Sequence, residues 1–380
     1  MGESHPSLEY LLVACIAAAL AFVLTPLARR LAIRWQALAM PRDRDVHAVA
    51  TPRMGGVALF AGFALALFVA ARLPSLDRSF TTGPEMPWLV ASAAIICAVG
   101  MIDDRFELDS LTKLAGQVLA CGVMVTKGGV QLLYIPLGHQ TVSLGRDLGI
   151  PITILFALLL INAMNFIDGL DGLAAGVVAI AATSFFVYSY LISKTFDPPN
   201  VFSSATFISA ALIGCCLGFL PHNVHPARLF MGDSGALLLG LLLAAATIST
   251  TGNVTPSQVS ANPVIALLMP LVVPAAIILL PLVDVLLAVV RRTRHGQRPW
   301  QPDAQHLHHR MLKIGHGHRR AVLLLWLWAA VAAGGSVSFV FLEDPWVAAG
   351  GVVGLLAVAV VLTVWLPRWA PPDRKTQRAH

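Results

Sequence analysis

LEYLLVACIAAALAFVLTPLA, residues 8–28, is an almost unbroken apolar stretch with a single acidic residue. As an α-helix it is long enough to cross the hydrocarbon core of a bilayer, which takes about 20 residues. The rest of the chain has the same character, because 57% of its 380 residues are hydrophobic and only 12% are charged. Soluble domains carry roughly 25% charged residues. The sequence therefore excludes a soluble fold and predicts an all-α integral membrane protein.

Ten further apolar stretches follow, and together they predict a polytopic protein with about eleven transmembrane helices. The stretch 88–102 is short, and 263–290 is interrupted by three prolines, which kink a membrane helix without preventing it. The predicted count is therefore good to about one helix. The predicted spans are 8–28, 55–73, 88–102, 111–126, 149–163, 172–192, 203–220, 235–251, 263–290, 321–342 and 346–366.

Two segments between or after the spans have a character of their own. Residues 128–148 hold the short runs VQLLYIP and QTVSL between glycines, which predicts a small external β-hairpin. Residues 367–380 are basic and contain prolines, which predicts a cytoplasmic tail. Because no linker or repeat divides the remainder, residues 1–366 are expected to form one membrane domain.

The lysines and arginines between the spans are distributed unequally. With the N-terminus outside, 21 of them lie on one side of the membrane and five on the other. Since loops rich in Lys and Arg stay in the cytoplasm, we expect an outside N-terminus and a cytoplasmic C-terminus. This pattern explains the net charge of +6 without a nucleic-acid partner. The first nine residues contain no Lys or Arg, so the first helix is expected to stay as an anchor.

Four clusters of polar residues follow predicted spans, and all four fall on the predicted cytoplasmic side. Carboxylates that converge with amide oxygens suit a hard divalent cation such as Mg²⁺, which keeps waters and substrate phosphates in its shell. The clusters therefore point to a phosphorylated substrate. They are Asp103-Asp104, NAMNFIDGLDG from Asn162 to Gly172, FMGDSG from Phe230 to Gly235 and HLHHR from His306 to Arg310.

The acidic and basic residues of these clusters also have structural interpretations. Asp168 and Asp171 stand one helical turn apart and are expected to open a helix, where free N–H groups attract phosphate oxygens. The same pair can simply cap that helix. Likewise Asp233 can cap a turn, and Lys113 can extend to lipid headgroups.

The histidine cluster and one acid inside a span leave alternatives of the same kind. The spacing of the histidines matches no Cys/His zinc pattern, and their arginine-rich flanks favour phosphate binding. Asp284 lies well inside the predicted span 263–290. An acid in that position is either functional or paired with a nearby Arg or His.

Taken together, the motifs resemble one known family. From about residue 40 to 320 the chain is similar to the polyprenyl-phosphate N-acetylhexosamine-1-phosphate transferases. These bacterial enzymes move a sugar 1-phosphate from a UDP-sugar to the phosphate of a membrane polyprenol, release UMP and use Mg²⁺. The ordered set that carries the resemblance is Met54-Gly55-Gly56, Asp103-Asp104, Asn162-x-x-Asn165-x-x-Asp168-Gly-Leu-Asp171-Gly-Leu, Phe230-Met-Gly-Asp233-Ser-Gly and His306-x-His308-His309-Arg310.

The resemblance implies a role for each matching residue. Asp233 and Asn165 match metal-binding positions, for Mg²⁺ or for Mn²⁺ in its place. Asp103 matches the residue proposed to deprotonate the lipid phosphate, and Asp104 lies beside it. Lys113 matches a lysine that contacts the diphosphate.

Two further groups match parts of the substrate site. The first group matches the uridine pocket and the substrate contacts next to it, and it comprises Asn162, Asp168, Gly169, Asp171, Asn223 and Phe230. Within this group, Asp168 is also expected to be catalytic. The second group matches a catalytic loop that closes over the sugar phosphates; it comprises His306, His308, His309 and Arg310.

The resemblance also implies the reaction. We expect transfer of N-acetylglucosamine 1-phosphate from UDP-N-acetylglucosamine to undecaprenyl or decaprenyl phosphate, the step that starts O-antigen, teichoic acid or arabinogalactan synthesis. The His-Leu-His-His-Arg-Met loop and the two spans after it resemble this branch. The alternative is the phospho-N-acetylmuramoyl-pentapeptide transferase branch, which ends soon after a different histidine loop. A lipid-linked transporter or flippase fits less well, because its polar residues would lie near the midplane of the membrane.

Location, assembly and mechanism complete the expectations. The resemblance places the protein in the bacterial plasma membrane with its active site on the cytoplasmic face, and it allows a homodimer. Direct displacement of UMP by the lipid phosphate is the preferred mechanism. A covalent aspartyl-phosphate on Asp104 stays open as the alternative.

Overall fold

The computed structural model is almost entirely helical. It describes residues 6–39, 50–73, 76, 83–137, 140–196, 204–253, 272, 275, 293, 316–342 and 344–369. The helices of these ranges are α1 (Pro6–Arg34), α2 (Gly55–Ala70), α4 (Glu85–Phe106), α5 (Ser110–Thr126), α6 (Gly145–Ile167), α7 (Leu173–Phe196), α8 (Ser204–Asn223), α9 (Gly232–Asn253), α12 (His318–Phe341) and α13 (Pro345–Trp369).

Eight of these helices are long and apolar enough to span a membrane, and α2 and α5 are shorter apolar helices. This confirms a polytopic, all-α membrane protein. Ten of the eleven predicted spans overlap one of the helices. Of the eleventh, 263–290, only residues 272 and 275 are among the described residues and Asp284 is not, so the total of eleven stays a prediction.

One span is longer than its apolar sequence indicates. The predicted segment 88–102 is the middle of α4, which runs from Glu85 to Phe106. The helix continues through the polar turn Ile-Asp-Asp-Arg, and its backbone ends at Glu107, whose φ of 48° is left-handed. Hydrophobicity therefore underestimated the length of the helix, because its last turn contains the charged residues Asp103, Asp104 and Arg105.

The central helix of the bundle is α9, and 89% of its membrane-spanning window is buried. Its sequence is rich in Leu and Ala on every side, which is typical of a helix surrounded by protein. Close packing at its start depends on two glycines of neighbouring helices. A Cβ at Gly56 of α2 or at Gly100 of α4 would lie 2.1 Å or 2.4 Å from the backbone of Ser234. These glycines therefore let α2 and α4 approach the first turn of α9.

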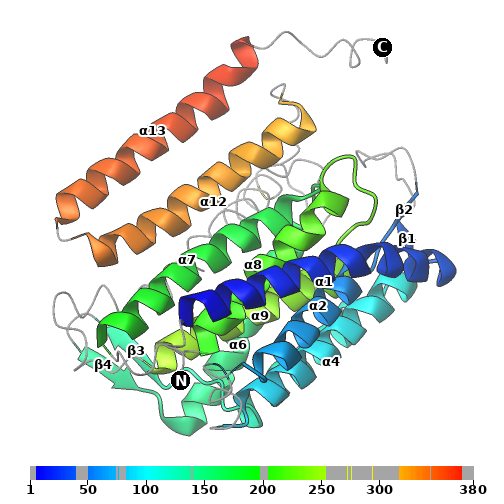
Figure 1. The fold of residues 1–380 in the computed structure, drawn as a ribbon, viewed down its shortest axis with the longest axis horizontal. Helices are drawn as coiled ribbons and strands as arrows, with labels where there is room; N and C mark the ends of the chain where they lie inside the picture. Colours follow the sequence, from blue (N-terminus) through cyan, green and yellow to red (C-terminus); the bar gives the residue numbers. More distant parts are fainter. Residues whose placement is uncertain are drawn as a thin grey trace.

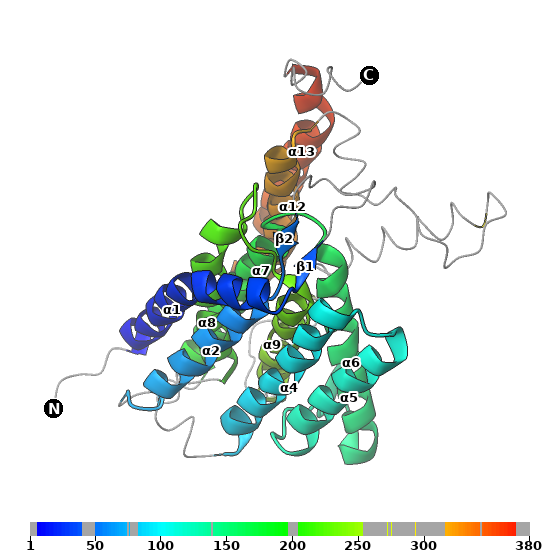
Figure 2. The same cartoon turned by 90° about the vertical axis from the view of Figure 1, so that its right-hand side faces the viewer.

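Helices α12 and α13 form a layer beside this bundle (Figure 1), and Figure 2 shows both projecting away from it. The indole of Trp326 on α12 fits over Gly176 of α7, where a Cβ would lie 1.9 Å from the ring, and it donates to Leu173 O at 3.3 Å. α13 contacts α12, for example through Trp328 Nε1 and Thr363 Oγ1 at 3.2 Å. Only 11% of the spanning window of α13 is buried, and most of its valines and leucines are exposed.

Two small antiparallel sheets complete the described fold. β3 (Tyr134–Leu137) pairs with β4 (Gln140–Ser143), which confirms the predicted hairpin within 128–148. The second sheet was not predicted from the sequence: β1 (Leu38–Ala39) pairs with β2 (Thr51–Pro52). The strand β2 leads into α2 and lies beside the segment before α9, because Pro52 O accepts a hydrogen bond from Phe230 N at 2.9 Å.

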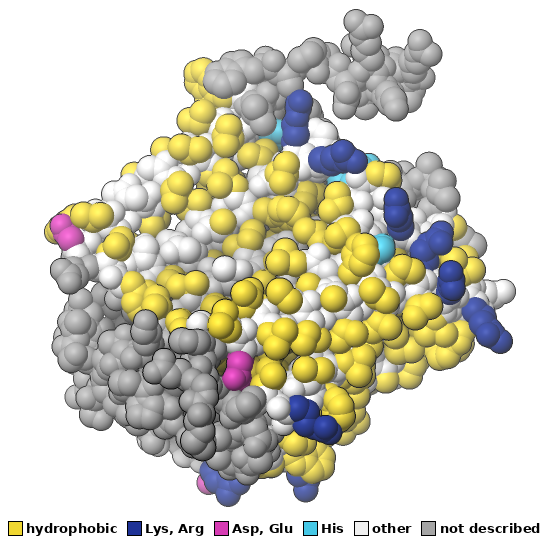
Figure 3. Space-filling model, viewed as in Figure 1, with side chains coloured by type: hydrophobic (Ala, Val, Ile, Leu, Met, Phe, Trp, Pro, Cys, Tyr) yellow, Lys and Arg dark blue, Asp and Glu magenta, His cyan; other side chains and the backbone are white. Residues whose placement is uncertain are grey.

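Most of the lysines and arginines that are visible in Figure 3 lie along one edge of the molecule. Figure 3 shows an apolar surface in yellow, with Lys and Arg along its right-hand edge and a few more at the lower edge. In the same view, Figure 1 places the end of α1 and the β1–β2 sheet at the right.

The helix α13 runs to Trp369, three residues into the predicted tail 367–380. The rest of that tail lies outside the described residues.

Candidate active site

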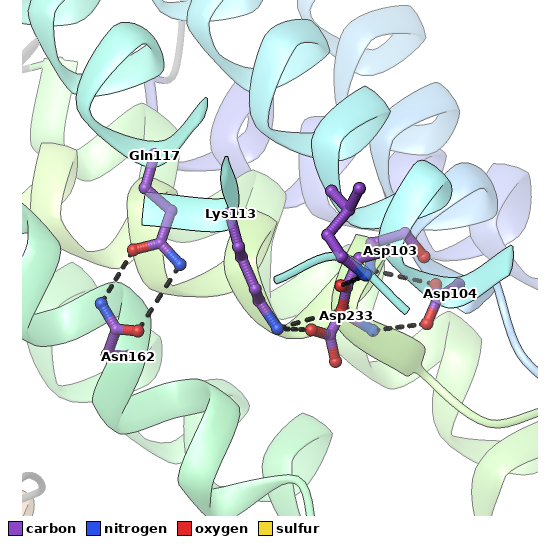
Figure 4. A network of polar contacts seen from close by, with 8 residues as sticks. Asp103, Asp104, Lys113, Gln117, Asn162 and Asp233 are labelled. Carbon is purple, nitrogen blue, oxygen red and sulfur yellow. Dashed lines mark hydrogen bonds and ion pairs between the residues drawn. The ribbon is translucent and has the colours of Figure 1, made fainter. Parts of the chain in front are cut away.

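The site is centred on three charged side chains from three helices (Figure 4). Lys113 Nζ lies 3.1 Å from Asp103 Oδ2 and also pairs with the carboxylate of Asp233. Asp103 is in the last turn of α4, Lys113 in the first turns of α5 and Asp233 in the first turn of α9. The side chains of Asp103 and Lys113 are only 14% and 17% exposed, so their attraction is less screened than at an open surface.

Local structure explains where Lys113 points. Asp109 is the N-cap of α5, and its Oδ1 accepts from the backbone N–H groups of Leu111 and Thr112, each at 3.0 Å. Asp103 Oδ1 accepts from Leu108 N at 2.8 Å in the short turn between α4 and α5. The two oxygens of the Asp103 carboxylate therefore have different partners: Oδ1 orders the turn, and Oδ2 binds Lys113.

Asp104 binds the backbone at the start of α9. Its side chain is buried, Oδ1 accepts from Asp233 N at 2.8 Å, and Oδ2 accepts from Ser234 N at 3.1 Å. Gly232 adopts a φ of +67°, and a Cβ there would lie 2.5 Å from both Asp104 oxygens. Because the N-terminus of a helix has unpaired N–H groups, a carboxylate from a second helix stabilises it. Asp104 thus fixes the position of Asp233.

The structure corrects the prediction that Asp168 and Asp171 open a helix. α6 ends at Ile167 with Asp168 as its C-cap, and α7 begins only at Leu173. Both acids lie in the turn between the helices. Gly172 has a φ of +79°, a backbone conformation that interrupts a helix, and this is the physical reason for the difference.

This turn is fixed by residues near the end of α8. Asn223 Oδ1 accepts from Gly172 N at 3.0 Å, and its Nδ2 donates to Leu229 O at 3.0 Å. Asp171 Oδ2 accepts from His225 Nδ1 at 2.8 Å and from Ala227 N at 3.1 Å. The predicted residues Asp171 and Asn223 are therefore neighbours in space. His225 was missed, although it stands two residues after Asn223 in the sequence.

Asp168 connects the turn electrostatically to the rest of the site. Burial, and then the negative charges of Asp104 and Asp171, raise the pKa of Asp168 to about 7, while the charge of Arg53 opposes the rise. Arg53 was also missed by the sequence prediction. Its signal was its place directly before Met54-Gly55-Gly56, and the structure brings that motif to α9: the N–H of Gly55 donates to Phe230 O at 3.1 Å.

The remaining predicted residues of the described part lie around this centre. Asn162 Nδ2 donates to Gln117 Oε1 at 2.8 Å, and Gln117, which the sequence did not single out, joins α5 to α6 (Figure 4). Asn165 is half-buried one turn further along α6, and within the described residues it forms no hydrogen bond with Asp233. Phe230 is half-buried before α9, and Gly169 is exposed in the turn.

The predicted loop residues His306, His308, His309 and Arg310 lie outside the described residues.

The donor set suits a hard cation at Asp233. Asp103 and Asp233 direct carboxylate oxygens at one cationic group, the ammonium of Lys113. Oxygen ligands of this kind are those that Mg²⁺ uses in proteins, together with water and phosphate. Asp104 is less suited, because both of its oxygens already accept backbone N–H groups. A cluster of acids around one lysine can bind a cation and a diphosphate side by side.

Comparison with known proteins agrees with this chemistry. The sequence profile of glycosyl transferase family 4 matches residues 86–251. The decaprenyl-phosphate N-acetylglucosaminephosphotransferase of Mycolicibacterium smegmatis is 46% identical over 365 residues, which cover 96% of this chain and 89% of that protein. The probable undecaprenyl-phosphate N-acetylglucosaminyl 1-phosphate transferase of Bacillus subtilis is 32% identical and covers 80% of this chain and 78% of its own length.

A relative that is named for the transfer of a different group is also similar. The phospho-N-acetylmuramoyl-pentapeptide-transferase of Desulforudis audaxviator is 30% identical over 351 residues, 84% of this chain and 95% of that protein. The similarities cover 80% to 96% of this chain. The chain therefore belongs to the polyprenyl-phosphate N-acetylhexosamine-1-phosphate transferases that its motifs resemble.

Proposed function

We propose that this protein transfers N-acetylglucosamine 1-phosphate from UDP-N-acetylglucosamine to a membrane polyprenyl phosphate and releases UMP. The observation that carries the proposal is the group of Lys113, Asp103 and Asp233 at the start of α9. The relatives named for N-acetylglucosamine transfer support the same sugar, at identities up to 46%. The product would begin a cell-envelope polysaccharide.

The reaction is a displacement at phosphorus. An oxygen of the lipid phosphate attacks the β-phosphorus of the UDP-sugar, the bond from that phosphorus to the bridging oxygen breaks, and UMP leaves with the bridging oxygen. Negative charge grows on the phosphate oxygens, so catalysis depends on alignment and on positive charge nearby. We assign the diphosphate contact to Lys113 and the removal of a proton from the lipid phosphate to Asp103.

Asp233 is the proposed ligand of Mg²⁺, with Asn165 as the second predicted ligand and Mn²⁺ as a substitute. When bound, the ion supplies positive charge at the transferring phosphate. Asp168, Asp171, Asn223 and Phe230 are assigned to the uridine end of the donor. Asn162 and Gly169 stay predictions for the substrate site, as do the four loop residues.

A direct displacement fits the site better than a covalent intermediate on Asp104. Both oxygens of Asp104 accept N–H groups of α9, and its side chain is buried. An attack by Asp104 on phosphorus would remove a carboxylate oxygen from the helix that carries Asp233. The phosphate of the lipid is therefore the proposed nucleophile.

The transfer itself is tested with purified protein, polyprenyl phosphate, Mg²⁺ and three donors. We expect UMP and a lipid-linked N-acetylglucosamine phosphate with UDP-N-acetylglucosamine, little product with UDP-glucose and none with the muramoyl-pentapeptide nucleotide. A pocket that binds the N-acetyl group leaves polar groups unpaired when that group is missing. Mass spectrometry of the lipid product identifies the group that was transferred. Efficient transfer from the muramoyl-pentapeptide nucleotide would support the second branch instead.

The position of the acids argues against a transporter. In the membrane-spanning helices that the structure describes, the acidic residues lie near the helix ends. Asp103, Asp104 and Asp233 lie at one end of the bundle, and Glu85 and Asp147 lie at the other. A transport site would place such groups near the midplane. Magnesium-dependent release of UMP separates the two functions.

We also propose that the site faces the cytoplasm of a bacterial plasma membrane, with the N-terminus outside and the C-terminus inside. Helix α5 offers a matched pair of positions, since Ser110 is at its site end and Thr126 at its other end, and both are exposed. In a cysteine-free background, an impermeant maleimide should label T126C in intact cells and S110C only after permeabilisation. Labelling of S110C in intact cells would reverse the orientation. The homodimer stays a prediction.

A further inference from the structure

Asp171, His225 and His318 form a compact group at the rim of the site. Among the residues that the structure describes, this is the group of three whose possible ligand atoms lie within 4.8 Å of one another. Its members come from the α6–α7 turn, from the segment after α8 and from the first residue of α12. Two histidines and a carboxylate first suggest a transition-metal site.

The ring geometry favours a different role. The imidazoles of His225 and His318 are stacked, with centroids 4.0 Å apart and planes inclined by 19°. A histidine binds zinc through a nitrogen lone pair in the plane of its ring, at about 2.0 Å. Two nearly parallel, stacked rings direct their lone pairs along separate planes, so they do not converge on one ion. In addition, His225 Nδ1 is hydrogen-bonded to Asp171.

A second contact holds the same residue from the same helix. Arg319, the next residue of α12, donates through Nε and Nη2 to the carbonyl oxygen of His225, at 3.1 Å and 2.9 Å. The first turn of α12 therefore contacts both the ring and the backbone of His225. α12 is itself positioned on α7, because Trp326 packs over Gly176.

On its other side His225 reaches the donor site. It bonds Asp171, and Asn223 bonds the adjacent Gly172, so one segment after α8 supports the α6–α7 turn at two points. We propose that His318 and Arg319 are positioning residues, which fix His225 and through it the Asp171 side of the nucleotide pocket. This inference rests on the proposed function, which assigns Asp171 and Asn223 to uridine.

The test is a separation of kinetic constants in the full-length purified protein. H318A and R319A should each raise KM for UDP-N-acetylglucosamine about three- to tenfold, the size expected for the net contribution of one ring stack or one solvent-exposed hydrogen bond. The kcat and the KM for polyprenyl phosphate should stay at wild-type values, because neither residue touches the reacting phosphates. H318F restores a ring for stacking but has no nitrogen, so it should recover the donor KM.

Arg320 provides the matched control, since it is the next residue of α12 and is exposed. R320A should leave all three constants unchanged. If H318F fails as H318A does and purified wild-type protein contains stoichiometric zinc by mass spectrometry, the group is a metal site and the proposal is wrong. A loss of kcat at unchanged donor KM would also overturn it.

Two outcomes keep this inference separate from the proposed function. If wild-type protein transfers N-acetylglucosamine phosphate but both alanine variants keep its donor KM, only the inference fails. If wild-type protein gives no transfer, calorimetric binding of UMP to wild type, H318A and R319A replaces KM as the measured quantity. Should H318A not fold, R319A decides the result alone, because its contact is to the backbone of His225 rather than to the ring stack.

Discussion

Asp233→Asn is expected to lower the rate of transfer by at least about a hundredfold, which corresponds to about 2.7 kcal/mol of transition-state stabilisation. Asparagine keeps the shape of the side chain but removes the negative charge that pairs with Lys113 and that would hold a divalent cation. The backbone N–H of residue 233 still donates to Asp104, so α9 keeps its start. Steady-state UMP release measures the loss, and thermal unfolding in detergent should change little.

Asp147 offers a control for this experiment. It is also an acid in the first turn of a helix, α6, but at the end of the bundle away from the site. Asp147→Asn should leave the rate near that of wild type, because it removes the same charge from a helix start without touching the reaction. If Asp233→Asn retains more than about a tenth of the wild-type rate, Asp233 is not an essential ligand.

Asp104→Ala is expected to have a comparable effect on the rate and, unlike the first change, to destabilise the protein. It leaves the N–H groups of Asp233 and Ser234 without their buried acceptors, and each such loss costs about 1–3 kcal/mol. The start of α9 would shift, and Asp233 with it. We expect a rate reduced at least about a hundredfold and a clearly lower unfolding temperature.

The matched control for Asp104 is Asp109. Both carboxylates accept two backbone N–H groups at a helix start, but Asp109 is exposed and caps its own helix α5. Asp109→Ala should lower the unfolding temperature only slightly and leave most of the transfer rate. An Asp104→Ala protein with wild-type unfolding temperature but no activity would instead indicate that Asp104 reacts directly.

The helices could be predicted from the sequence because each depends on residues close together in the chain. A run of about 20 apolar residues has no low-energy state in lipid other than a helix, since its backbone groups must bond to each other. Where the last turn was polar, as in α4, hydropathy missed it. The β1–β2 sheet was also missed, because strands of two residues leave no pattern.

The types of residue in the site could also be predicted from the sequence, but the contacts that each residue makes could not. Asp103 and Asp104 are adjacent and look alike in the sequence. In the structure one contacts Lys113 and the other holds α9, because successive side chains of a helix point in directions about 100° apart. Which of them faces the site depends on how α4 is rotated against α9, and that rotation depends on Gly100.

The sequence by itself determined the membrane-spanning helices, the hairpin and the set of polar residues at the helix ends, because composition and local spacing decide these properties. The tertiary structure alone decided which of those residues meet. Gln117 pairs with Asn162 across 45 positions, and His225 bonds Asp171 across 54. The stack of His225 on His318 likewise joins the segment after α8 to α12, which is far away in the chain. Such contacts follow from the packing of whole helices, where every close approach depends on the partner surface, and no local pattern records that surface.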